Sequence, residues 1–91
     1  MRNRLSASEY YSAIQRAINS LSAWRLQDSY GRTMMAAIED GRCMLGLESC
    51  EDYCGNHIPA RGDVKDGTKG SRNYVVAACG DSWATEMESV T

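Results

Sequence analysis

The first apolar positions of the chain recur with the period of an α-helix. Ser6 and Glu9 have the spacing of a capping box, in which the two side chains accept backbone N–H groups of the first turn. Polar residues Gln15, Arg16 and Asn19 fall on the opposite side of the pattern. We therefore predict a helix that begins near Ser6. Its apolar face would consist of Tyr10 or Tyr11, Ile14, Ala17, Ile18 and Leu21.

A second helical pattern follows a serine-containing break at residues 20–23. We predict a helix from about Trp24 or Asp28 to Asp40, because Gly41 stands where a left-handed residue commonly ends a helix. Two amphipathic helices joined by a short break predict an antiparallel helical hairpin. The apolar side of the second helix would consist of Leu26, Tyr30, Met34, Ala37 and Ile38.

The pattern changes after this hairpin. Residues 55–73 include glycines and the only proline but few apolar residues, which predicts a long loop. Residues 74–76, Tyr-Val-Val, form a short β-prone run and predict a strand. Asp81 or Ser82 is then placed to cap a final short helix through Trp83 and Met87.

Composition and charge narrow the classes of function. No apolar run approaches the roughly 20 residues of a membrane span, and no signal-like segment opens the chain, so we expect a cytoplasmic protein with reduced cysteines. Residues 1–37 carry five arginines against Glu9 and Asp28, a net charge of +3. Residues 38–54 carry five acids against Arg42, a net charge of −4. This segregation favours docking onto a protein surface, and direct nucleic-acid binding is not expected.

Four cysteines and a single histidine suggest a metal site. Zinc prefers four nitrogen or sulfur ligands in a tetrahedron, and Cys50, Cys54 and Cys79 can supply three of them. His57 would complete the set, with Cys43 as a substitute ligand. Alternatively, residues 43–54 form a helix in which the thiols belong to a core stripe without metal. That stripe would contain Cys43, Leu47, Cys50 and Cys54.

Two stretches resemble the signature of the DksA/TraR family of C4-type zinc-finger proteins. The first is the helix end A-I-E-D-G-R at residues 37–42, followed by C-E-D-Y-C-G-N-H-I-P-A-R at residues 50–61. The second is C-G-D-S at residues 79–82, where Ser82 replaces the last cysteine of the family pattern. Tyr53 is an additional residue between the first two cysteines. The resemblance covers residues 37–86 and implies one structural zinc in a site that has lost one ligand.

Together these features predict a mainly α fold in a single domain, residues 1–91. Residues 1–41 would form the N-terminal helical hairpin. Residues 42–91 would form a small, irregular, zinc-finger-like half with a long Gly-rich loop, a short strand and a C-terminal helix.

Members of this family enter the secondary channel of bacterial RNA polymerase and bias transcription initiation. The resemblance therefore implies a small non-enzymatic regulator that binds that polymerase. We expect the partner to contact the tip of the hairpin and the basic part of the loop. The expected contact residues are Trp24, Arg25, Asp28, Tyr30, Arg61, Lys65, Lys69 and Arg72.

Two other functions are consistent with the sequence. The first is a phage or mobile-element inhibitor of a host defence complex or nuclease, similar in kind to an anti-CRISPR protein. The second is a helical interaction module without metal. Trp24, Met34 and Met35 are expected to be exposed, and their exposure would also allow a homodimer. Catalysis is not expected, because a single histidine beside a cysteine provides neither an orienting group nor a pocket.

Overall fold

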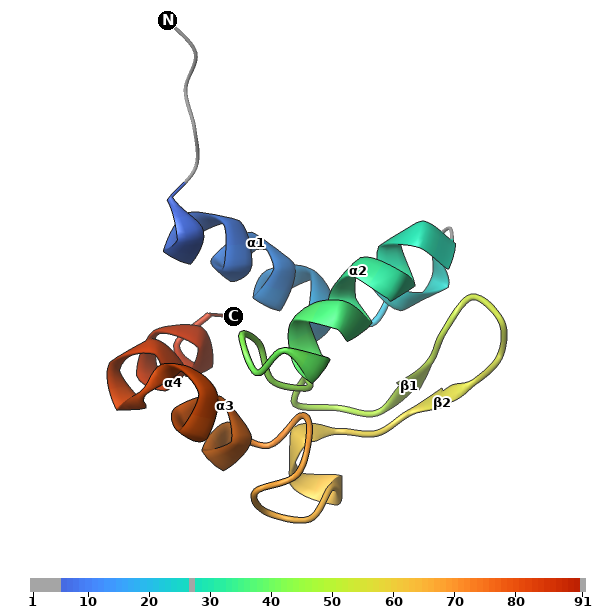
Figure 1. Ribbon diagram of the computed structural model, residues 1–91. Helices are drawn as coiled ribbons and strands as arrows, with labels where there is room; N and C mark the ends of the chain where they lie inside the picture. The colour runs from blue at the N-terminus through green and yellow to red at the C-terminus, as the bar shows by residue number, and fades with distance from the viewer. Residues whose placement is uncertain (1–5, 27, 91) are drawn as a thin grey trace, which may run out of the picture.

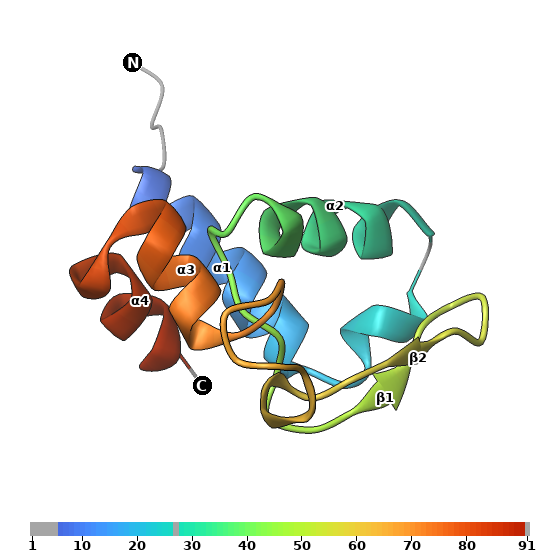
Figure 2. The same cartoon turned by 60° about the horizontal axis from the view of Figure 1, so that its bottom comes forward.

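The computed structural model describes residues 6–26 and 28–90, and it is mainly helical with one small antiparallel sheet. Helices α3 and α4 pack together at one end of the molecule, and the β1–β2 hairpin lies at the other end (Figures 1 and 2). This confirms the predicted mainly α fold with a C-terminal helix. The elements are α1 (Ala7–Asn19), η1 (Ala23–Arg25), α2 (Asp28–Glu39), β1 (Cys50–Glu51), β2 (His57–Ile58), η2 (Arg61–Asp63), α3 (Arg72–Cys79) and α4 (Asp81–Glu88).

Helix α1 begins where its capping box predicts. The Ser6 backbone N–H donates to Glu9 Oε1 at 2.8 Å, and the Glu9 N–H donates to Ser6 Oγ at 3.1 Å. Ile14 and Ile18 are buried, as the apolar stripe predicts. Tyr10 was expected on the same buried face, but 47% of it is exposed. The reason is that the core contacts α1 along only part of its apolar side.

Gln15 is fully buried, so the prediction that it faces solvent is wrong. Its Nε2 donates to the Met44 carbonyl at 2.9 Å, and its Oε1 accepts the Met44 N–H at 2.9 Å. The amide therefore pairs with one residue of the irregular segment that follows α2, much as a neighbouring strand would. We call this pair of hydrogen bonds the Gln15–Met44 clamp.

Helix α2 packs against α1, so the two form the predicted hairpin (Figure 1). The helix ends at Glu39, and Gly41 has a φ of 75°, which confirms its predicted left-handed conformation. An added Cβ at Gly41 would also collide with the Ala78 Cβ, so α3 requires glycine at this position. Met34 and Ile38 are buried, which also corrects the expectation that Met34 is exposed.

The predicted strand at Tyr74-Val75-Val76 is wrong, because these residues lie in α3. Ser71 caps this helix by accepting the Tyr74 N–H, and Val75 is fully buried in the core. The Tyr74 hydroxyl donates to the Glu39 carbonyl at 2.8 Å, which attaches α3 to the end of α2. The helix preference of valine is only a few tenths of a kcal/mol weaker than average, so the cap and tertiary burial override it.

The final helix is confirmed, although Gly80 rather than Asp81 or Ser82 occupies its N-cap position. The alternative helix at residues 43–54 is wrong: the chain there is irregular until β1, and Leu47 is 71% exposed. The predicted loop at residues 55–73 includes β2, η2 and turns at Gly67 and Gly70. Within the described residues, no helix combines the length and the apolar character needed to cross a lipid bilayer.

The core lies between the four α-helices and the segment that contains Met44. Two indole N–H groups attach neighbouring elements: that of Trp24 donates to the Ile18 carbonyl and that of Trp83 to the Arg42 carbonyl. Cys43 and Met44 have no exposed surface. The segment that the sequence assigns to the zinc-finger-like half is therefore partly a core element. The buried residues of this core cluster are Ile14, Ile18, Trp24, Met34, Ala37, Ile38, Cys43, Met44, Leu45, Ile58, Val75, Ala84 and Met87.

Candidate functional site

The β1–β2 hairpin separates the candidate zinc ligands that lie on it. Cys50 pairs with Ile58 and Glu51 pairs with His57. Successive side chains of a strand point to opposite faces, so Cys50 and His57 lie on opposite faces of the hairpin. Cys50 packs against the core, whereas His57 is exposed.

Cys79 lies with Cys43 at the other end of the molecule. The Cys79 thiol donates to the Gly41 carbonyl at 3.5 Å, and the Cys43 thiol donates to the Tyr11 carbonyl at 3.4 Å. Burial, together with the nearby Cys79, raises the pKa of Cys43 to about 12. Such a thiol stays protonated at neutral pH, and zinc requires the thiolate.

Among the described residues, no three His, Cys, Asp or Glu side chains are grouped so that they could hold a metal ion. The predicted set of Cys50, Cys54, His57 and Cys79 therefore does not converge. The described arrangement does not fit the zinc site that the resemblance implies, because α3, which ends at Cys79, lies at the other end of the molecule from the β1–β2 hairpin (Figure 1).

Asp52, a residue that the sequence analysis did not select, organises the turn between the first two cysteines. Its Oδ1 accepts the N–H groups of Cys54 at 2.9 Å and Asn56 at 2.8 Å, and its Oδ2 accepts the Asn56 side-chain amide at 3.2 Å. The hydrogen bond from the Asn56 backbone is the main reason that the pKa of Asp52 is lowered. The carboxylate of Asp52 thus closes the turn through these hydrogen bonds. Asp52 and Gly55 are residue types that favour turns, and they are the sequence signal that could have identified this one.

The predicted contact residues at the hairpin tip differ in how far they are buried. Trp24 is only 3% exposed and belongs to the core, so its predicted exposure is wrong. Arg25 is exposed, and Tyr30 is 55% exposed. The side chain of Asp28 lies outside the described part of the structure.

The predicted basic loop is not one continuous surface. The Arg61 guanidinium donates from Nε to the Leu45 carbonyl at 2.8 Å, and burial lowers its pKa. Arg72 binds the carboxylates of Asp81 at 3.3 Å and Glu88 at 3.0 Å, so it connects α3 to α4. Lys69 pairs with Glu39 at 3.7 Å, and Lys65 is exposed.

An apolar groove of about 390 Å³ lies between α1 and α2. Leu26 and Tyr30 on its α2 side are 51% and 55% exposed, and Tyr10 lies across from them on α1. The sequence analysis placed these three residues on core stripes, but they line an open surface. We call this surface the α1–α2 groove, and its lining residues are Tyr10, Ala13, Ile14, Ala17, Ala23, Leu26, Tyr30, Thr33 and Met34.

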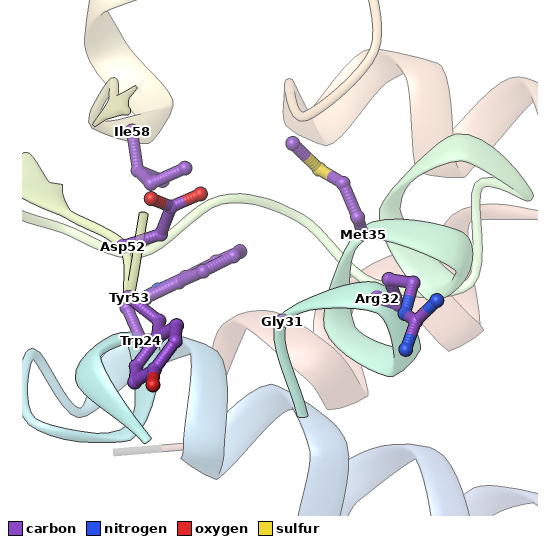
Figure 3. A pocket seen from close by; sticks show the side chains of 7 residues that line it. All are labelled: Trp24, Gly31, Arg32, Met35, Asp52, Tyr53 and Ile58. Atoms are coloured by element: carbon purple, nitrogen blue, oxygen red, sulfur yellow. The ribbon is translucent and has the colours of Figure 1, made fainter. Parts of the chain in front are cut away.

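A second hollow of about 120 Å³ lies on another face of α2, which we call the Gly31 pocket. Figure 3 shows its two walls: η1 and the β-hairpin form one wall, and α2 forms the other. A neighbouring hollow of about 150 Å³ shares Met35 with this pocket and continues along α2 toward Glu39. The Gly31 pocket is lined by Trp24, Gly31, Arg32, Met35, Asp52, Tyr53 and Ile58.

Comparisons with protein-family models, with curated proteins and with solved structures each found no match to this chain.

Proposed function

We propose that the protein is a small non-enzymatic regulator that binds another protein through the α1–α2 groove. The observation that carries this proposal is the exposure of three large side chains, Tyr10, Leu26 and Tyr30, along one groove between two helices. A groove of this kind is the surface that accepts an amphipathic helix of a partner. We therefore expect the partner to insert the apolar side of a helix.

Charge supports the choice of an acidic helix. Residues 1–37, which include α1 and most of α2, carry a net charge of +3. Arg16 and Arg25 are both exposed. Arg16 is next to the groove residue Ala17 in the chain, and Arg25 is next to the groove residue Leu26. Opposite charges at the rim of an interface increase the association rate and disfavour wrong partners.

The partner is proposed to be a bacterial protein complex in the cytoplasm. RNA polymerase is the first candidate, and this choice rests on the sequence resemblance alone. A host defence complex or nuclease is the alternative. The α1–α2 groove does not depend on zinc, so the binding proposal is independent of the metal that the resemblance implies.

The test is affinity capture from a bacterial lysate followed by identification of the bound proteins. Leu26→Glu and Tyr30→Glu place a charge in the groove and should abolish capture of the partner. Leu47→Glu is the matched control, because Leu47 is 71% exposed and does not line the groove. Capture that is equal for the wild type and both groove variants would refute the proposal. RNA polymerase subunits among the groove-dependent proteins would support the first candidate, and their absence would favour the alternative.

A further inference from the structure

Gly31 is a residue of α2 that no neighbour within the described structure requires. Glycine within a helix is less stable than alanine by up to about 1 kcal/mol. A Cβ added at Gly31 would meet no atom within 4 Å, whereas one at Gly41 would collide with Ala78. The packing of the chain therefore explains Gly41 but not Gly31. Glycine also allows a ligand to approach the backbone closely, and Gly31 lines a pocket.

The size of the Gly31 pocket suits one side chain. Its volume is about 120 Å³, and a cavity of about 150 Å³ in another protein accommodates benzene. Trp24, Met35 and Ile58 provide apolar lining. The neighbouring hollow also has Met35 in its lining, so there is space beside the pocket for the chain that carries the inserted group. A polypeptide segment therefore fits this surface better than a compact free molecule.

Charge on the hairpin wall selects the kind of side chain. Asp52 lines the pocket, and its carboxylate is the negatively charged group of that wall. It accepts hydrogen bonds from the Asn56 backbone and side chain and from the Cys54 N–H, and the Gly55 N–H also contributes to its lowered pKa. These donors favour the ionised carboxylate, which can pair with a cationic ligand. The segment that contains Asp52, residues 38–54, has a net charge of −4. Its one basic residue, Arg42, lies over the ring of Tyr11 at 5.5 Å, in a different part of the molecule.

Arg32 lines the opposite wall, and Figure 3 shows its side chain directed away from Asp52. A cation in the pocket is therefore favoured on the hairpin side. Tyr53, which is 64% exposed, adds an aromatic ring on that side. Aromatic faces attract ammonium and guanidinium groups.

We propose that the Gly31 pocket binds a lysine or arginine side chain of a partner polypeptide. The aliphatic stem lies over Gly31 between Trp24 and Met35, and the cationic group pairs with the carboxylate of Asp52. This deepens the proposed function, because the basic residue belongs to a protein partner. The site is separate from the α1–α2 groove.

The first test is an NMR titration with short capped peptides that differ at one central residue. The lysine peptide should cause saturable shifts at the Gly31 and Asp52 amides and at the Trp24 indole. The norleucine peptide has the same stem without charge and should bind about fivefold more weakly, as expected for loss of an exposed ion pair. The glutamate peptide should cause no saturable shift at these groups. Equal binding of the lysine and norleucine peptides would overturn the role of Asp52.

Pentylamine distinguishes a partner side chain from a free amine. It should bind more weakly than the lysine peptide, because it lacks the chain that extends past Met35. Equal affinity would refute the polypeptide part of the proposal.

The second test uses Gly31→Ala with Ser29→Ala as its control. Both variants add helix preference to α2 and should raise the melting temperature. Only Gly31→Ala narrows the pocket, so it alone should weaken binding of the lysine peptide. A Gly31→Ala protein that binds the peptide as the wild type does would refute the site. Leu26→Glu should leave peptide binding unchanged, so failure of the groove proposal and failure of this one give different results.

Discussion

The two parts of the cysteine-bearing segment, residues 41–46 and residues 50–58, are held in different ways. In the first part, Cys43 and Met44 have no exposed surface, and the Gln15–Met44 clamp connects residues 29 positions apart. In the second part, the carboxylate of Asp52 closes the turn through residues at most 4 positions away. The first part thus depends on the rest of the fold, and the second part is closed by its own side chains.

This difference explains why the candidate zinc ligands are not grouped within the described residues. Cys43 is held in the core, and Cys79 is attached near it by its hydrogen bond to the Gly41 carbonyl. Cys50 and His57 are instead positioned by the strand pairing of the hairpin. A tetrahedral site would need both parts to meet. The same difference leaves the hairpin free to form one wall of the Gly31 pocket.

Removing the clamp should have the largest effect. Gln15→Ala leaves the buried N–H and carbonyl of Met44 without their partner, and each unsatisfied group costs about 1–3 kcal/mol. We expect the free energy of unfolding to fall by about 2–4 kcal/mol, a large part of the stability of a small domain. Urea unfolding would measure it. Arg16→Ala, on the exposed side of the same helix, should change stability by less than about 0.5 kcal/mol. Similar values for the two variants would contradict the structural role of the clamp.

The cysteines of the two parts should react with a thiol reagent at different rates. Cys54 is exposed, whereas Cys43 is fully buried and its pKa is raised to about 12. At pH 8 only about one Cys43 thiol in 10⁴ would be ionised, so it should react at least about 100-fold more slowly than Cys54. Mass spectrometry of partly alkylated protein would assign the rates. Cys54→Ser should remove the fast phase, and all cysteines should react alike in denaturant. Fast modification of native Cys43 would show that the first part opens easily.

The smallest effect on global stability is expected from Asp52→Ala. The turn would lose its acceptor, so the amides of Cys54 and Asn56 should exchange faster with solvent while the melting temperature changes little. The pKa of Asp52 is lowered in the folded protein, so its stabilising contribution is complete above the ordinary Asp range and is lost as pH falls through the folded value. Amide shifts of residues 54 and 56 followed from neutral to acidic pH would measure that loss. Cooperative unfolding of the whole chain with this variant would show that the two parts are coupled.

Much of the fold could be predicted from local signals. The capping box at Ser6 and Glu9 predicts the start of α1, and Gly41 predicts the end of α2. These signals work because the groups that satisfy each other lie within one turn of the chain. The candidate metal site could not be predicted in the same way, because its ligands come from segments whose relative placement depends on packing.

The sequence by itself therefore determined the helical hairpin, the final helix and the left-handed Gly41 that follows α2. The tertiary structure decided that Tyr74-Val75-Val76 joins a helix, that Gln15 is buried and that no three candidate ligands among the described residues lie together. The physical reason is the range of the interactions. Caps and helical periodicity act over a few residues, whereas the Gln15–Met44 clamp and the contact between Gly41 and Ala78 join segments that meet only after the chain has folded.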